Sequence, residues 1–206
     1  EQVASQEKSE NEKSIAVLAF ENRSADKANE YFSDGVAEEI LNSLAKVKDL
    51  KVAGRTSSFF FKGKNENLTT IGKTLGVAHV LEGSVRKQGD KLRITAQLIR
   101  VSDGFQIWSE NFEGTDADIF ALQEKIARQV TSELKVALNA GQQSQLIDTG
   151  TSSPEAYALY LQATAIFNRR DTAQYQDAVA ALQKALALDP KYARAHSRLA
   201  TLHATL

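Results

Sequence analysis

Apolar and polar residues alternate with a period of two along residues 79–112, as in a strand with one buried face. Two turn signals interrupt this stretch, Gly89-Asp90 and Asp103-Gly104. These residue types favour the positive φ angles of tight hairpin turns. The pattern therefore predicts an antiparallel meander of three strands. The other elements of the N-terminal part are expected to cover its apolar face.

Two short apolar runs, residues 14–20 and 50–53, predict buried strands before the meander. Apolar positions three and four residues apart predict a helix over residues 29–47 and a short one that ends at Gly76. After the meander, Thr115 or Asp116 can cap a long amphipathic helix that runs to about Asn139. This order of elements predicts an α/β sandwich with a mixed five-stranded sheet.

From Pro154 onward the pattern is helical throughout, and a proline suits the first turn of a helix. The segment DAVAALQKALALDP matches the second helix of a tetratricopeptide repeat, with packing residues at the repeat's spacing: Ala178, Leu182, Ala185 and Pro190. One and a half repeats leave a face that a neighbour normally covers. The array therefore either continues in a longer chain or docks on the first domain.

These patterns divide the chain into an α/β domain, residues 14–140, and an all-α repeat segment, residues 154–206, with one full and one partial repeat. Residues 141–153 have the composition of a linker. Residues 1–13 contain too few apolar side chains to fold, so we expect a flexible tether, either a spacer or a frayed terminus. The lack of methionine, even at position 1, indicates a piece of a longer polypeptide.

Charge and composition narrow the possible partners. The 206 residues carry 25 basic and 26 acidic side chains, without the basic excess typical of nucleic-acid binding. The absence of cysteine excludes disulfides and thiolate metal sites. No run of apolar residues reaches the length of a membrane span, and we expect no signal peptide within these residues, although signal or anchor segments could lie upstream. We therefore expect no nucleic-acid contact, and membrane contact only through a segment outside this chain.

No catalytic motif is recognisable: the sequence contains no nucleophile elbow, phosphate loop or dinucleotide fingerprint. His196 and His203 are seven residues apart, but no carboxylate pattern accompanies them or His79 as a metal site would require. Glu38 and Glu39 are adjacent on a helix and point apart. We therefore expect no enzyme activity, no metal and no cofactor.

The segment RTSSFFFKGKN, with three phenylalanines between basic residues, invites a ligand-site interpretation. The alternative, which we favour, is that alternate phenylalanines enter the core while Gly63 turns the chain. Ligands of open α/β sheets gather beyond the carboxyl ends of strands. The residues expected near the ends of the first two strands are therefore candidate contacts, although each also suits an ordinary turn or surface position: Asp34, Gly35, Arg55, Ser57, Ser58 and Lys62.

Residues 14–138 resemble a bacterial family whose domain is related to the N-terminal domain of TolB. The matching segments are SIAVLAFENRS, YFSDGVAEEI, RTSSFFFKGKN, IGKTLGVAHVLEGSVRKQGDKLRITAQLI, DGFQIWSENF and DIFALQEKIA. The resemblance implies a three-layer α/β/α sandwich like that of anticodon-binding domains, with the fourth strand antiparallel to the rest. It implies no catalytic residues. It also implies a place outside the inner membrane, between a membrane helix and tetratricopeptide repeats, as in CadC-like transcriptional regulators and some cyclase-linked sensors.

Together the resemblance and the repeats predict a non-catalytic sensor or protein-interaction module of a membrane-anchored regulator. The expected location is the periplasmic side of the inner membrane. We expect a protein or peptide partner, and any DNA-binding domain would lie upstream of these residues. Two alternatives remain: an envelope scaffold or assembly protein, and the non-catalytic part of a nucleotide cyclase. Partner, ligand and oligomeric state are left open.

Overall fold

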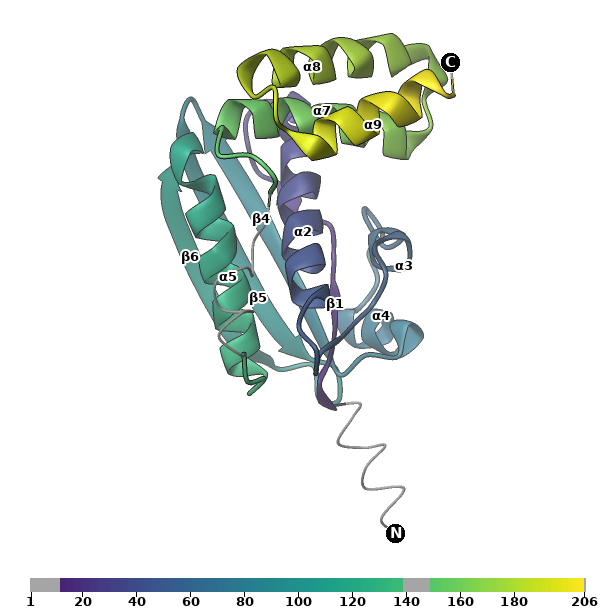
Figure 1. Ribbon diagram of the computed structural model, residues 1–206. Helices are drawn as coiled ribbons and strands as arrows, with labels where there is room; N and C mark the ends of the chain where they lie inside the picture. Colours follow the sequence, from purple (N-terminus) through teal and green to yellow (C-terminus); the bar gives the residue numbers. More distant parts are fainter. Residues whose placement is uncertain (1–11, 139–148, 206) are drawn as a thin grey trace.

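The computed structural model describes residues 12–138 and 149–205, and its N-terminal part is built on one mixed sheet (Figure 1). The strands follow the spatial order β3-β1-β4-β5-β6. β1 (Ser14–Val17) pairs in parallel with β3 (Lys51–Val52) and β4 (His79–Gln88). β5 (Lys91–Arg100) is antiparallel to both β4 and β6 (Gln106–Thr115). The five predicted strands are thus confirmed, and the fourth is antiparallel to its neighbours.

A sixth strand, β2 (Glu21–Asn22), pairs in parallel with the far end of β4 and was not predicted. Two residues are too few to produce a periodic pattern in the sequence. The polar loop between the first strand and the first long helix therefore contains a short extension of the sheet.

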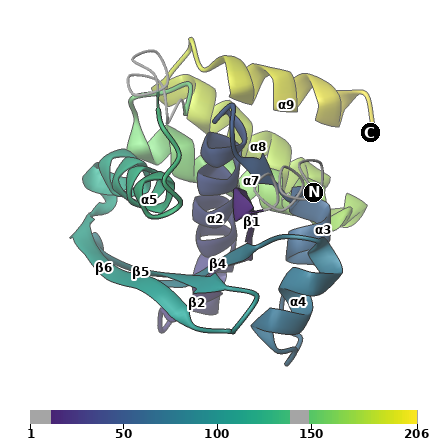
Figure 2. The ribbon, with the colours of Figure 1, turned by 90° about the horizontal axis from the view of Figure 1, so that it is seen from below.

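Helices cover both faces of the sheet. Ile15 and Val17 belong to the larger core, beneath α2 (Glu30–Ala45) and α5 (Ile119–Glu133). Ala16 and Leu18 belong to a smaller core on the side of α3 (Arg55–Phe59) and α4 (Leu68–Leu75). Figure 2 shows α2 and α5 together on one side of β4–β6, with α3 and α4 apart from them. The predicted three-layer α/β/α sandwich is confirmed.

Both hairpin turns and the end of α4 lie at the glycines where the sequence predicts them. Gly89 and Gly104 have φ angles of 61° and 74° in the two hairpin turns. Gly76 takes the left-handed conformation after α4. The end of α5 was predicted wrongly: the helix stops at Glu133, and Lys135, with φ of 51°, leaves the helical conformation.

The three consecutive phenylalanines follow the interpretation favoured above. Phe61 is buried in the smaller core and Phe59 packs at the edge of the larger one, while Phe60 is 64% exposed. Gly63, with φ of 72°, turns the chain. Lys64 lies over the exposed Phe60 ring.

The C-terminal segment consists of α7 (Pro154–Arg169), α8 (Tyr175–Leu188) and α9 (Ala193–His203). Short 3-10 turns precede α2, α5 and α8, at Lys27–Asn29, Asp116–Asp118 and Thr172–Gln174. Three of the predicted repeat-packing residues are fully buried: Ala178, Leu182 and Ala185. Pro190 is exposed between α8 and α9, so it ends α8 and does not pack between helices.

The repeat helices dock on the α/β domain. α7 crosses α2, and one continuous hydrophobic core includes residues of the sheet, of α2 and α5, and of α7–α9 (Figure 1). Most of the predicted tether (1–11) and of the predicted linker (141–148) lies outside the described residues. The division into residues 14–140 and 154–206 remains our proposal.

Candidate functional site

The predicted ligand contacts lie on α2 and on the segment that follows β3. Arg55 donates from Nε to Glu38 Oε2 at 2.7 Å. Lys62 donates to Asp34 Oδ1 at 2.6 Å and also pairs with Glu30. Three ion pairs thus connect α2 to the region of α3, and three of the five residues in them are predicted ligand contacts: Asp34, Arg55 and Lys62.

Ser57 and Ser58 are not brought together with these charges. Ser57 is exposed on α3, and Ser58 is fully buried. The Ser58 hydroxyl has no hydrogen-bond partner among the described residues. Neither serine lines the cleft described next.

A cleft of about 110 Å³ lies between α2, Arg55, α7 and α9. Asp34 and Gly35 line it together with Arg55, so three predicted contacts share one site. Its far wall comes from α7 and α9, whose docking on the first domain was one of the two alternatives left open above. The remaining lining residues are Tyr31, Glu38, Glu39, Tyr160, Leu161, Thr164, Ala165, Asn168, Arg169 and Arg194.

Gly35 on α2 packs directly against Leu161 on α7. A Cβ atom built on it would be 2.6 Å from Leu161 Cδ1 and 2.9 Å from Leu161 Cγ. Both residues are buried. The absence of a side chain at Gly35 is therefore explained by helix packing.

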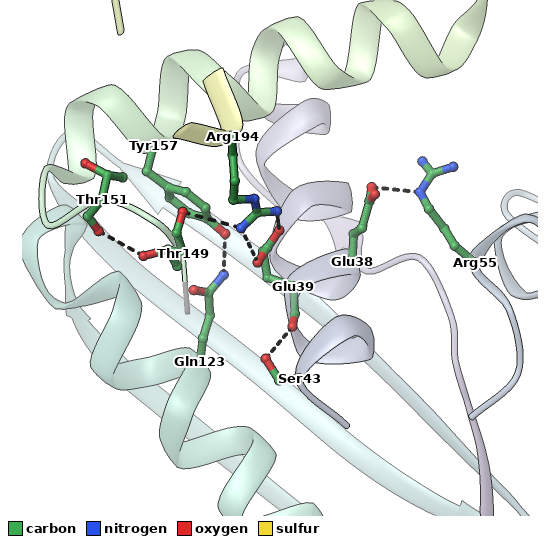
Figure 3. A network of polar contacts seen from close by, with 9 residues as sticks. All are labelled: Glu38, Glu39, Ser43, Arg55, Gln123, Thr149, Thr151, Tyr157 and Arg194. Atoms are coloured by element: carbon green, nitrogen blue, oxygen red, sulfur yellow. Dashed lines mark hydrogen bonds and ion pairs between the residues drawn. The ribbon is translucent and has the colours of Figure 1, made fainter. Parts of the chain in front are cut away.

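The strongest polar link between the two parts of the chain joins α2 to α9 (Figure 3). Arg194 donates from one terminal nitrogen to Glu39 Oε2 at 3.0 Å and from the other to Glu39 Oε1. Glu39 is only 4% exposed, and the Arg194 guanidinium lies over the Tyr160 ring, 4.9 Å from its centroid. Planar, two-point pairing of this kind is a strength of arginine.

A second polar link joins α5 to α7. Gln123 Nε2 donates to the Tyr157 hydroxyl at 2.8 Å, and both side chains are fully buried. Burial, with a contribution from the charge of Glu39, raises the pKa of Tyr157 well above its usual value of about 10. The Tyr157 hydroxyl therefore stays neutral, as a buried group in an apolar setting must.

Sequence reasoning missed these links because their partners are distant along the chain. Glu39 and Arg194 are 155 residues apart, and Gln123 and Tyr157 are 34 apart. Glu39 looked like an ordinary surface acid. The position of Glu39 on the apolar side of its predicted helix was the one sequence feature that could have indicated a buried partner.

Two of the three histidines contact backbone carbonyl groups. His79 contacts the Ser14 carbonyl oxygen at 3.3 Å, and His196 contacts the Pro190 carbonyl oxygen at 2.9 Å. Within residues 12–138 and 149–205 no group of three or more His, Asp or Glu side chains could hold a metal ion. No helix in these ranges is long and apolar enough to cross a bilayer.

The Asp34 carboxyl is expected to make the stability of the folded protein depend on pH. Burial raises its pKa above the ordinary value, although Lys62 acts in the opposite direction. The folded protein thus holds this proton more tightly than the unfolded chain. The stabilising contribution of Asp34 is therefore complete below the unfolded pKa of about 4 and is lost as pH rises through the folded pKa.

We accordingly expect the stability of an Asp34→Asn variant, relative to wild type, to increase as pH rises through that window. Urea unfolding of both proteins at a series of pH values measures the difference. A difference that stays constant across the window would contradict the assignment.

We predict that Gly35→Ala lowers the free energy of unfolding by about 1–3 kcal/mol through overpacking. Without the contact to Leu161, replacing a glycine by alanine within a helix would stabilise the protein by about 1 kcal/mol, because alanine has the higher helix propensity. Urea unfolding should therefore show that Gly35→Ala becomes neutral or stabilising in a Leu161→Ala background. Equal effects in both backgrounds would mean that the two helices do not meet at Gly35.

Two protein families match the chain. Residues 11–129, more than half of its length, match the HilA/YgeH-like transcriptional regulators in their second domain. Residues 169–206 match a TPR repeat. The tetratricopeptide prediction is thereby confirmed.

One curated relative is named putative adenylate cyclase 3 and comes from Rhizobium meliloti (strain 1021). It is 38% identical over 192 residues, which are 93% of this chain and 33% of the relative. The chain therefore spans about a third of the length of that protein.

Solved structures with a similar arrangement have low sequence identity. The LpoB C-terminal domain from Salmonella enterica is 17% identical, with a TM-score of 0.42 over 51% of this chain and 84% of its own. TolB from Acinetobacter baumannii is 15% identical, with a TM-score of 0.43 over 59% of this chain and 28% of its own.

Proposed function

The chain belongs to the family of HilA/YgeH-like transcriptional regulators through their second domain, and from this premise we propose that it is the non-catalytic sensor and protein-interaction module of a bacterial regulatory protein. The observation that carries the proposal is the joining of this regulator domain to a TPR repeat that docks on its helix α2. Stacked helical repeats build concave surfaces suited to proteins and peptides.

The partner surface we propose is the hollow between α7 and α9. It measures about 230 Å³ and is lined by Tyr160, Arg194, Ser197, Arg198 and Thr201. The Arg198 guanidinium lies 4.6 Å from the centroid of the Phe167 ring, which holds it over α7. Arg194 is already paired with Glu39, so the Tyr160 ring and the Arg198 guanidinium are the groups that suit a peptide with apolar and acidic side chains.

Capture experiments test this surface. A biotinylated full-length protein, crosslinked in its host, should recover one dominant partner. Ser197→Trp, which fills the hollow from an exposed position, should abolish recovery, whereas Gln183→Trp on the exposed side of α8 should not. Equal recovery by both variants would rule out this surface.

We further propose that the module lies on the periplasmic side of the inner membrane and is anchored through a segment outside these residues. The resemblance of residues 14–138 to the family related to the TolB N-terminal domain supports this location. Alkaline phosphatase fused after the full-length protein should be active, and a fused green fluorescent protein should stay dark. The reverse pattern would place the module in the cytoplasm.

A second candidate is the non-catalytic part of a nucleotide cyclase. The relative named putative adenylate cyclase 3 favours it. Expression of the full-length protein in a cyclase-deficient strain should then raise cyclic AMP, and no increase would leave the transcriptional regulator as the better proposal. An envelope scaffold is the third candidate, which recovery of several envelope lipoproteins in the capture experiment would favour.

A further inference from the structure

The cleft between α2 and α7 has the size of a site for a very small ligand. Its 110 Å³ equal the volume of about four water molecules. Sites for drug-sized ligands are several times larger, at about 300–1,000 Å³. An occupant of this cleft would therefore have only a few non-hydrogen atoms.

Asp34 and Glu38 bring two carboxylates to the α2 wall of the cleft. Asp34 and Glu30 share Lys62, and Arg55 adds a weaker attraction to the Asp34 charge. Burial keeps the pKa of Asp34 raised even with Lys62 beside it. A second cation near Asp34 would stabilise its charged form.

The cleft also offers unused hydrogen-bond donors. Arg55 is held by Glu38 through Nε, and its guanidinium lies 4.5 Å from the centroid of the Phe59 ring. Its two terminal nitrogens have no partner in the described part of the chain, and Figure 3 shows them free of the bond to Glu38. Arg169, in the last turn of α7, lines the rim and likewise pairs with no described residue. A guanidinium with free terminal nitrogens fits a carboxylate.

A third feature is a buried hydroxyl in the wall. Thr164 is 5% exposed, and its Oγ1 has no hydrogen-bond partner among the described residues. Buried polar groups are normally paired, so an unpaired one needs an explanation. Asn168, one turn further along α7, adds an amide to the same wall.

From these features we infer that the cleft binds a free α-amino acid with a small side chain. Its ammonium group would lie at Asp34, and its carboxylate between Arg55 and Arg169. The inference rests on the sensor function proposed above and names the class of molecule that is sensed. Because the walls belong to α2 and to α7, the ligand would bridge the regulator domain and the repeat helices.

Isothermal titration calorimetry on the purified chain tests this with L-alanine and two analogues that each lack one charge. Propionate lacks the ammonium group and ethylamine lacks the carboxylate. We expect L-alanine to bind at least about tenfold more tightly than either analogue, because each loses a charge-assisted hydrogen bond. No binding of L-alanine, or equal binding of either analogue, would overturn the inference.

Variants locate the binding. Arg55→Gln and Thr164→Val should each weaken L-alanine binding. Thr164→Val preserves the shape of the side chain, so it still tests the site if Arg55→Gln does not fold. Arg93→Gln, which breaks an exposed ion pair with Glu113 on the sheet, is the matched control and should bind as wild type. Unchanged binding by Thr164→Val and a folded Arg55→Gln would overturn the site. If L-alanine does not bind, the partner-capture experiment of the proposed function is unaffected. Failure of the ligand proposal can therefore be distinguished from failure of the proposed function.

Discussion

Replacing Ala178 by arginine is expected to unfold the three repeat helices while the α/β domain stays folded. Ala178 is fully buried on α8, the helix that packs along α7. An arginine there introduces both volume and a charge without a partner. Uncompensated burial of a charge costs several kcal/mol, more than one and a half repeats can withstand.

Two spectroscopic signals separate the parts of the molecule in that experiment. The single tryptophan, Trp108, lies in β6 and packs against Phe112, so its fluorescence reports on the α/β domain. Far-ultraviolet circular dichroism reports mainly on helices. We expect Ala178→Arg to lose helical signal and keep a cooperative Trp108 transition, at a lower midpoint because α2 loses its cover. Gln183→Arg, on the exposed side of α8, should change neither signal. Loss of the Trp108 transition would contradict two separable domains.

Much of this architecture could be predicted because it depends on local patterns. The meander followed from a period of two and from two glycines that take positive φ angles. The repeat followed from small residues at a fixed spacing, and Ala178, Leu182 and Ala185 are indeed buried. Errors occurred where the pattern is weak, as in the two-residue strand β2 and the end of α5.

The second large effect is expected from Arg194→Met. The substitution would leave Glu39 buried beneath the repeat helices without its partner. Removing one member of a buried ion pair typically costs about 3–5 kcal/mol. Because Arg194 is itself partly exposed, we expect about 3 kcal/mol, mostly as weaker docking of α7–α9 on α2.

Urea unfolding followed by circular dichroism measures this loss. The exposed pair of Arg93 and Glu113 is the control, and Arg93→Met should cost at most about 1 kcal/mol. A double variant, Glu39→Leu with Arg194→Met, removes both charges and should recover most of the stability. If Arg194→Met costs no more than Arg93→Met, the ion pair does not hold the repeat helices in place.

The candidate site was predictable only in part. The carboxyl ends of β1 and β3 pointed to Asp34 and Arg55, and both residues line one cleft. That they contact a ligand stays a prediction. Gly35 also lines it, but for a reason no local pattern contains, since its neighbour Leu161 lies 126 positions later in the sequence. Half of the cleft belongs to the repeat helices, so it could not be foreseen without knowing how the two parts dock.

The docking of α7 on α2 is the central claim, and one crosslinking measurement tests it directly. The chain has no cysteine, so Gly35→Cys with Leu161→Cys creates its only two thiols. A Cβ at Gly35 would be 2.9 Å from Leu161 Cγ, which places the two new side chains within reach of a disulfide. Under mild oxidation we predict that both thiols disappear into an intramolecular disulfide, whereas Leu161→Cys with Gln183→Cys, on the exposed side of α8, keeps them free. Two reactive thiols remaining in the first variant would contradict the docked arrangement.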